Sequence, residues 1–180
     1  MHPLRLLSAL TATAVLATSA LYAQRDTLCH DRVPTESSIS IAAPDEPGSR
    51  LSISGRVLTG DDRTPVVGAR LLAFHTDDEG YYSVGGMDEQ NARLCGVLST
   101  DTEGRYRIET IKPAHYATGG PPAHIHFELT LPGERMRRLT LNFEGDPELH
   151  GQPAGEIWET IRPVEERDGS LHVDRDFWLR

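Results

Sequence analysis

The chain has 180 residues, of which 38% are hydrophobic, and a formal net charge of −9 at pH 7. This length and apolar content suit one compact domain with a single core and leave too little chain for two. The negative charge argues against a nucleic-acid partner, because binding to a phosphate backbone requires a basic face.

Residues 1–23 have the pattern of a secretory signal peptide. Arg5 precedes an apolar run rich in Ala and Leu, from Leu6 to Leu21, and the small residue Ala23 suits cleavage. The run is short for a membrane span of about 20 residues. The sequence therefore predicts export to the periplasm or the medium with no stable membrane anchor after cleavage, and a single transmembrane anchor is the alternative.

Residues 24–48 are polar and contain several prolines, which predicts a tail or a wrap-around arm and not a core element. Cys29 lies in this arm, and Cys95, the other cysteine, lies in the body of the chain. An oxidising compartment permits one disulfide between them, which would tie the arm to the domain. Two unpaired thiols are the alternative.

From residue 49 onward, short alternating runs are separated by Gly, Pro and Asp turns. Residues 51–58 alternate apolar and polar side chains with the period of a half-buried strand. Further strands are predicted over residues 66–75, 97–99, 105–111, 123–130, 137–143 and 171–180. Residues 154–162 suit either a brief helical turn or another strand. Many short strands with regular turns and little helix predict one all-β sandwich over residues 49–180.

A His-x-His pair stands out in the predicted strand 123–130. Residues i and i+2 of a strand project from the same face, so His124 and His126 would point together and Ile125 would face the core. Two imidazoles suit iron, zinc, copper or nickel. Taken alone, the pair is also what a surface strand carries by chance.

Several motifs, in their order along the chain, resemble those of the intradiol ring-cleavage dioxygenases, the family that includes protocatechuate and catechol dioxygenases. They are Gly55-Arg-Val with Pro65-Val-Val-Gly-Ala69, Asp77-Asp-Glu-Gly-Tyr-Tyr82, Thr100-Asp-Thr-Glu-Gly-Arg-Tyr106, Thr110-Ile-Lys-Pro with Tyr116, Pro122-Ala-His-Ile-His-Phe127, Asn142-Phe-Glu-Gly-Asp-Pro147 and Phe177-Trp-Leu-Arg180. The resemblance covers residues 49–180. It implies the family's core fold, a β-sandwich of antiparallel sheets of the transthyretin or immunoglobulin kind.

By position, the resemblance makes Tyr82, Tyr116, His124 and His126 the ligands of a non-haem ferric ion, and no other cofactor is implied. Tyr81 is the rival of Tyr82, but the spacing of the motif favours Tyr82. Two phenolates are hard anions that favour ferric iron, and the charge of the ion would lower the phenol pKa well below its ordinary value of about 10. Two neutral imidazoles leave a position for hydroxide or substrate.

The remaining histidines and one tyrosine have other expected places. We expect His75, His115 and His150 to lie at the surface or behind the ligands. Tyr106 is expected in the core.

The resemblance implies that O2 opens a catechol-like ring between its two hydroxyl-bearing carbons. The catechol chelates the ferric ion, which acts as a Lewis acid, and displaces hydroxide and the axial tyrosine, here Tyr116. These departing bases take up the two catechol protons. Tyr116 is thus both a metal ligand and a catalytic residue.

Two positions depart from the family pattern. Pro121 stands where the family usually has an arginine, and Thr140 stands where it usually has a glutamine. Both missing groups would stabilise charge that builds on the substrate, and one such donor contributes about 3 kcal/mol or more to a barrier. The candidates to replace the lost cation are Arg93, Arg135, Arg137 and Arg138.

Two other functions fit parts of the sequence. One is a family member that keeps the iron but has altered or weak activity. The other is a metal-free binding module at the cell surface, because the pattern at residues 55–69 also occurs in transthyretin-like sandwiches without metal. The sequence leaves the ring substituents open and permits an oligomer.

Overall fold

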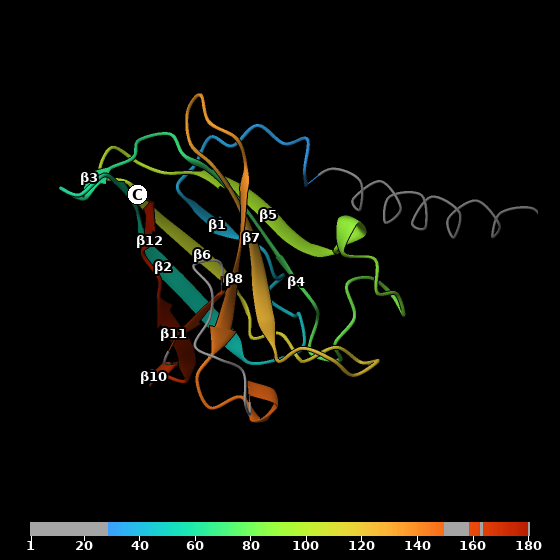
Figure 1. The fold of residues 1–180 in the computed structure, drawn as a ribbon. Helices are drawn as coiled ribbons and strands as arrows, with labels where there is room; N and C mark the ends of the chain where they lie inside the picture. The colour runs from blue at the N-terminus through green and yellow to red at the C-terminus, as the bar shows by residue number, and fades with distance from the viewer. Residues whose placement is uncertain (1–28, 150–158, 163, 180) are drawn as a thin grey trace, which may run out of the picture.

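The structure, a computed structural model, describes residues 29–149, 159–162 and 164–179. The predicted signal peptide, residues 1–23, lies outside the described residues. The regular secondary structure of the described chain is almost all β-strand, with two short 3₁₀ helices, which confirms the predicted all-β class (Figure 1). No helix in these described ranges is long and apolar enough to cross a membrane.

The strands are β1 (Ser38–Ser40), β2 (Arg50–Thr59), β3 (Thr64–Pro65), β4 (Arg70–His75), β5 (Leu94–Ser99), β6 (Arg105–Ile111), β7 (His124–Thr130), β8 (Arg137–Phe143), β9 (Glu159–Arg162), β10 (Glu165–Arg167), β11 (Ser170–Asp174) and β12 (Phe177–Leu179). The 3₁₀ helices are η1 (Glu89–Asn91) and η2 (Pro147–Leu149). The first sheet has the order β1-β6-β2-β11-β10, with β3 and β12 also paired to β2. The second sheet has the order β5-β4-β7-β8-β9.

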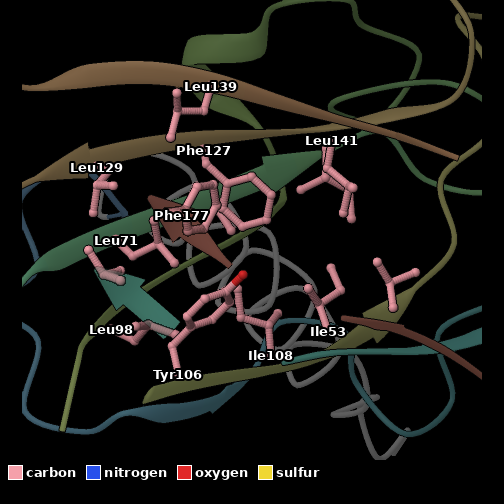
Figure 2. Close-up of a cluster of buried hydrophobic side chains, with 14 of the residues drawn as sticks. Ile53, Leu71, Leu98, Tyr106, Ile108, Phe127, Leu129, Leu139, Leu141 and Phe177 are labelled. Carbon is pink, nitrogen blue, oxygen red and sulfur yellow. The ribbon is translucent and has the colours of Figure 1, made fainter. Parts of the chain in front are cut away.

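The two sheets pack face to face around one apolar core. Figure 2 shows Ile53, Tyr106 and Ile108 of the first sheet opposite side chains of the second, such as Leu71 and Phe127. Tyr106 is 2% exposed, which confirms its predicted place in the core. Burial of this continuous apolar surface is the main stabilising contribution to the sandwich.

Strand β7 separates its side chains as its alternating sequence predicts. Ile125 and Phe127 belong to the inter-sheet core, so His124 and His126 project from the opposite, outer face of the second sheet. A second apolar cluster covers this outer face and includes Phe74 of β4. The histidines therefore lie under loops and not in open solvent.

In the described part of the predicted arm, residues 29–48, the expectation that it contributes nothing to the core does not hold. Residues Ser38–Ser40 form β1, which pairs parallel with β6, and Ile39 and Ile41 pack against the core. The sequence did not predict β1, because the segment is mostly polar and the alternation of its two isoleucines is too short to indicate a strand. Cys29 and Cys95 form a disulfide with a Cα–Cα distance of 6.2 Å, so the arm is tied to β5.

Several element bounds differ from the predicted ones. Strand β4 begins at Arg70 and not at residue 66, because Gly68 has a φ of 72° and turns the chain. Strand β5 is longer than predicted, and residues 159–162 are a strand. Four pairs in the described part are parallel, β1–β6, β2–β11, β2–β12 and β8–β9, whereas antiparallel sheets were expected.

Candidate metal centre

The side chains of the four predicted ligand residues meet at one point on the outer face of the second sheet. Tyr82 Oη lies 2.8 Å from Tyr116 Oη, and Tyr116 Oη lies 3.2 Å from His124 Nε2. His124 Nε2 in turn lies 3.0 Å from His126 Nε2. Three separate stretches of chain thus contribute two phenols and two imidazoles to a single cluster.

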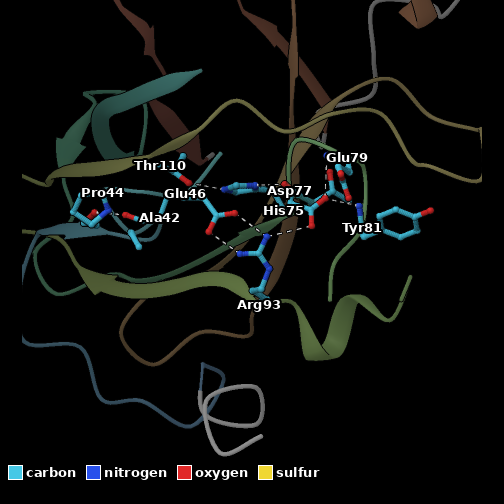
Figure 3. A network of polar contacts seen from close by, with 12 residues as sticks. Ala42, Pro44, Glu46, His75, Asp77, Glu79, Tyr81, Arg93 and Thr110 are labelled. Atoms are coloured by element: carbon cyan, nitrogen blue, oxygen red, sulfur yellow. Dashed lines mark hydrogen bonds and ion pairs between the residues drawn. The ribbon is translucent and has the colours of Figure 1, made fainter. Parts of the chain in front are cut away.

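Tyr82 is positioned by a tight turn that follows β4. Asp77 Oδ1 accepts hydrogen bonds from the backbone N–H groups of Glu79 and Tyr81, at 3.1 Å and 2.9 Å. The turn places Tyr82 in the outer apolar cluster with 2% exposure. Tyr81, its rival, is partly exposed, and its ring points away from the polar network around Asp77 (Figure 3).

Tyr116 is held against this turn through backbone contacts. The N–H of Ala117 donates to Gly80 O at 3.1 Å, and the N–H of Ala114 donates to Asp77 O at 3.0 Å. Gly80 has a φ of 87°, and a Cβ at this position would lie 2.2 Å from His115 O. Only glycine fits here, since it tolerates the positive φ and has no Cβ.

A polar network that is partly exposed supports the turn from behind (Figure 3). Arg93 makes two hydrogen bonds of 2.7 Å to the Glu46 carboxylate and one of 3.2 Å to Asp77. The bidentate geometry is the strong form of an arginine–carboxylate pair. Glu46 comes from the N-terminal arm, so the arm takes part in fixing the turn that carries Tyr82.

His75 belongs to the same network and is fully buried, which excludes a surface position and leaves the other expected place, behind the ligands. Its Nδ1 lies 2.7 Å from Thr76 O and its Nε2 lies 2.7 Å from Thr110 Oγ1. These two partners satisfy both ring nitrogens of a neutral imidazole, which is why burial is tolerated. Burial lowers the pKa of His75 to about 4. His115 is exposed, as expected, and His150 lies outside the described residues.

The protonation states of the centre follow from burial and hydrogen bonding. His124 Nδ1 lies 2.6 Å from Pro122 O, so Nδ1–H donates and the Nε2 lone pair faces the cluster. Burial lowers the pKa of His126 to about 3, so this ring is neutral at pH 7. Burial raises the pKa of Tyr82 and of Tyr116. When no metal ion is bound, both phenols therefore keep their protons.

The donor set fits a ferric ion. No group of three or more His, Cys, Asp or Glu able to hold a metal occurs among the described residues, and this cluster relies on two tyrosines instead. Two donor atoms that are each about 2.0–2.2 Å from one ion are roughly 3 Å apart, which matches the observed separations of 2.8–3.2 Å. Phenolate oxygens suit a hard, highly charged cation, and imidazoles suit iron.

A cavity of about 400 Å³ lies beside the cluster. Its walls are formed by His30, Phe74, Glu89, Gln90, Asn91, Glu128 and Arg138. The Phe74 ring lies 5.0 Å from the His126 ring, and the Arg138 guanidinium lies 5.4 Å above Phe74. Glu89 Oε2 lies 2.8 Å from Arg138 Nη2 and 3.7 Å from His126 Nε2.

Of the four arginines that the sequence offered as the missing cation, Arg138 is the one that lines this cavity. Arg93 is engaged with Glu46 and Asp77, and Arg137 pairs with Glu134 at 3.0 Å. Sequence reasoning missed Glu89 and Phe74, because neither stands in a motif and only the fold brings them to β7.

The chain is similar to known dioxygenases. A family profile described as Dioxygenase matches residues 18–161. Catechol 1,2-dioxygenase 1 of Acinetobacter lwoffii is 32% identical over 147 residues, which are 70% of this chain and 46% of that protein. The protocatechuate 3,4-dioxygenase beta chain of Burkholderia cepacia is 36% identical over 118 residues, 59% of this chain and 49% of that one. The chain spans about half the length of the curated relatives it matches.

Solved structures share the fold. The dioxygenase domain of a dioxygenase carbohydrate-binding protein fusion from Streptomyces sp. SirexAA-E aligns with a TM-score of 0.66 and 23% identity, over 81% of this chain and 90% of that one. Catechol 1,2-dioxygenase from Pseudomonas arvilla C-1 aligns with a TM-score of 0.66 and 21% identity, over 91% of this chain and 66% of that one.

Proposed function

Because the chain belongs to the intradiol ring-cleavage dioxygenase family, we propose that it is a non-haem ferric dioxygenase that opens a catechol-type ring between its two hydroxyl-bearing carbons with O2. The convergence of Tyr82, Tyr116, His124 and His126 on one point supports this most strongly. These four residues would hold the iron, which when bound supplies a Lewis acid for the two catechol oxygens.

Tyr116 is the residue suited to take a proton from the substrate. Burial raises the pKa of its phenol, so its phenolate binds a proton strongly whenever no cation neutralises it. Tyr116 is only partly buried, whereas Tyr82 is 2% exposed and packed in the outer apolar cluster. This difference supports Tyr116, and not Tyr82, as the phenol that would take up a substrate proton, while both tyrosines would hold the iron.

Arg138 is the residue suited to stabilise charge on the bound ring. It lies over Phe74, next to His126, on the wall of the adjoining cavity. Its ion pair with Glu89 holds the guanidinium at the side of the centre in the free protein. We propose that Arg138 stabilises this charge in place of the arginine that the family usually has at the position of Pro121.

We also propose that the protein works outside the cytoplasm. The disulfide between Cys29 and Cys95 supports this assignment, because such bonds persist in oxidising compartments. The predicted signal peptide provides the route of export. Fractionation of producing cells, with detection of the chain in the periplasm or medium, tests this proposal.

Iron content and colour test the centre. The purified chain should hold one iron and be reddish, since tyrosinate bound to ferric iron has a charge-transfer band. Tyr82→Phe should weaken or shift the band, and His124→Ala should abolish iron loading. A colourless protein that takes up no iron would instead favour the metal-free binding module.

Oxygen uptake with catechol, protocatechuate and hydroxyquinol then tests the reaction. Uptake with the formation of a ring-opened diacid is the expected result. A coloured protein that consumes no oxygen with any of the three would contradict ring cleavage. It would favour an iron-holding family member with altered activity, which the departures at Pro121 and Thr140 motivate.

A further inference from the structure

A second cavity, of about 380 Å³, lies on the other side of the second sheet from the candidate metal centre. Its walls are formed by Leu58, Arg63, Leu139, Arg162, Arg175, Asp176, Phe177, Trp178 and Leu179. Leu139 faces the inter-sheet core, whereas the centre lies on the outer face of the same sheet. The cavity is therefore built where β12, paired to β2, approaches β8 and the edge strand β9.

Arg175 is the buried cation of this cavity. The residue is 8% exposed, and its Nε is buried with no hydrogen-bond partner. Nη1 donates to the backbone oxygen of Asp176 at 2.8 Å. A buried guanidinium N–H without an acceptor is costly, and a charged group costs more than a neutral one.

The backbone of Arg175 is fixed from several sides. Its N–H donates to Ser54 O at 2.8 Å, and its carbonyl oxygen accepts from Tyr106 Oη at 2.5 Å. A Cβ on Gly55 would lie 1.9 Å from the same carbonyl oxygen, so glycine is required where the two backbones meet. The backbone that positions Arg175 in the cavity wall is thus a rigid part of the sandwich.

Two more guanidinium groups line the cavity. Arg162 also has a buried Nε with no hydrogen-bond partner, and Arg63 lies 4.6 Å over the Trp178 ring. None of the ion pairs found among the described residues includes any of the three arginines.

The charge of this cavity is unbalanced. Among the described residues that line it, Asp176 is the one with an acidic side chain, and Asp176 Oδ1 already accepts from the Arg56 N–H at 2.8 Å. Burial lowers the pKa of Arg175, and the nearby positive charge of Arg162 lowers it further. The Arg175 guanidinium lies 4.7 Å over the Phe177 ring but has no carboxylate within salt-bridge distance among the described residues. In a chain with a net charge of −9, this concentration of positive charge without a carboxylate partner indicates a place for an anion.

We propose that this cavity binds an organic carboxylate, with its head group on Arg162 and Arg175 and its apolar body against the leucines and Phe177. A guanidinium matches a carboxylate with paired N–H donors. Four of the other wall residues, Leu58, Leu139, Phe177 and Leu179, are apolar and give no partner to a fully hydrated ion. The volume also lies in the range of small-molecule sites, about 300–1,000 Å³.

Calorimetric titration of the full chain with hexanoate, hexanamide and inorganic phosphate tests the site. Hexanoate should bind at least ten times more tightly than hexanamide, which lacks the charge, and than phosphate, which lacks the apolar body. Arg162→Gln should weaken hexanoate binding about tenfold or more, the effect of one charge-assisted hydrogen bond. Arg167→Gln, at an exposed arginine paired with Glu165 on β10, is the matched control and should change nothing.

A His126→Ala variant separates this site from the metal centre. It should bind hexanoate as the unchanged chain does, because the cavity lies on the other side of the sheet. Equal binding of hexanoate and hexanamide, undiminished binding by Arg162→Gln, or loss of binding in His126→Ala would each overturn the proposal. Circular dichroism of every variant verifies folding, and Arg162 is partly exposed, so its replacement leaves the core intact.

Discussion

The Arg138 guanidinium lies on the wall of the cavity beside the candidate centre, and the sequence alone could not distinguish it from the other three candidate arginines. Glu128 of β7 is its register partner, and Thr140 of β8 is opposite His126. Arg138 therefore projects from the same face as the histidines, one step along the sheet from Thr140. This placement brings a guanidinium to the side of the centre from β8, whereas Pro121, the position of the family arginine, precedes β7.

Arg138→Gln should lower kcat for ring cleavage about 100-fold while the iron content and the charge-transfer band stay unchanged. The reason is that one preorganised donor to developing charge contributes about 3 kcal/mol or more to a barrier. Steady-state oxygen uptake measures the effect. Arg137→Gln, whose side chain pairs with Glu134 away from the cavity, is the control and should keep full activity. Equal kcat in the two variants would remove Arg138 from the reaction.

His75 should make the stability of the domain depend on pH. Its folded pKa is about 4 and its ordinary value is 6.5, so the unfolded chain binds more protons between these two values. The contribution is fully present above pH 6.5 and is lost as the pH falls toward 4, by roughly 3 kcal/mol in total. Urea denaturation at pH 7, 5.5 and 4.5 measures this loss.

His75→Gln is the comparison for this pH series. Glutamine keeps a donor and an acceptor near Thr76 and Thr110 but has no proton to gain. The variant should lose less stability than the unchanged chain between pH 7 and pH 4.5. Identical slopes in the two proteins would show that another group carries the acid sensitivity.

At the scale of the elements, strand β7 is the part of the site that sequence reasoning could predict. The alternation of Ile125 and Phe127 with two histidines sets which residues face the core and which meet on the outer face. Tyr82 and Tyr116 could be placed only through the family resemblance, because they lie in turns with no periodicity. Contacts between turns, such as Glu89 with Arg138, depend on a fold that brings together residues far apart in sequence.

Short strands and buried polar groups were the least predictable elements. Strand β1 has three residues, too few for its alternation to be recognised within a polar arm. The burial of His75 depends on Thr110 of β6, which belongs to the other sheet. The residues next to His75 in the sequence therefore could not predict its burial. Local pattern indicates which face a strand buries, whereas partners across the sandwich decide which polar groups are tolerated inside.

The turn that joins Tyr82 to Tyr116 gives a prediction at this scale. Gly80→Ala should lower iron content and melting temperature, because the added Cβ meets His115 O and the positive φ is strained. Gly119→Ala is the matched control, since Gly119 has a φ of 79° but open space around its Cβ position. The control should retain iron and lose only about 1 kcal/mol of stability. Iron retention by both variants alike would show that the turn does not position Tyr116.

At the scale of the whole molecule, the N-terminal arm is part of both the sandwich and the candidate site. Its β1 extends the first sheet, Glu46 pairs with Arg93 behind the Tyr82 turn, and Cys29 joins it to β5. His30, the next residue, lines the cavity beside the centre. Arg70 Nη2 donates to His30 O at 2.6 Å, which fixes the arm against β4. The arm therefore links the stability of the fold to the shape of the cavity beside the candidate centre.

Replacement of both Cys29 and Cys95 by serine tests this link. The disulfide closes a sequence separation of 66 residues, and the chain-entropy relation gives about 4 kcal/mol of stabilisation for a loop of that size. Denaturant unfolding should show a loss of this order.

The same double variant should bind catechol more weakly, because release of the arm removes His30 from the cavity wall. Its charge-transfer band should remain, since none of the four candidate ligands belongs to the arm. A raised KM with an unchanged band, measured at a temperature where the variant is folded, is the expected result. An unchanged KM would mean that the arm stabilises the sandwich without shaping the cavity. Loss of the charge-transfer band would mean that the outer apolar cluster needs the disulfide to hold Tyr82 in place.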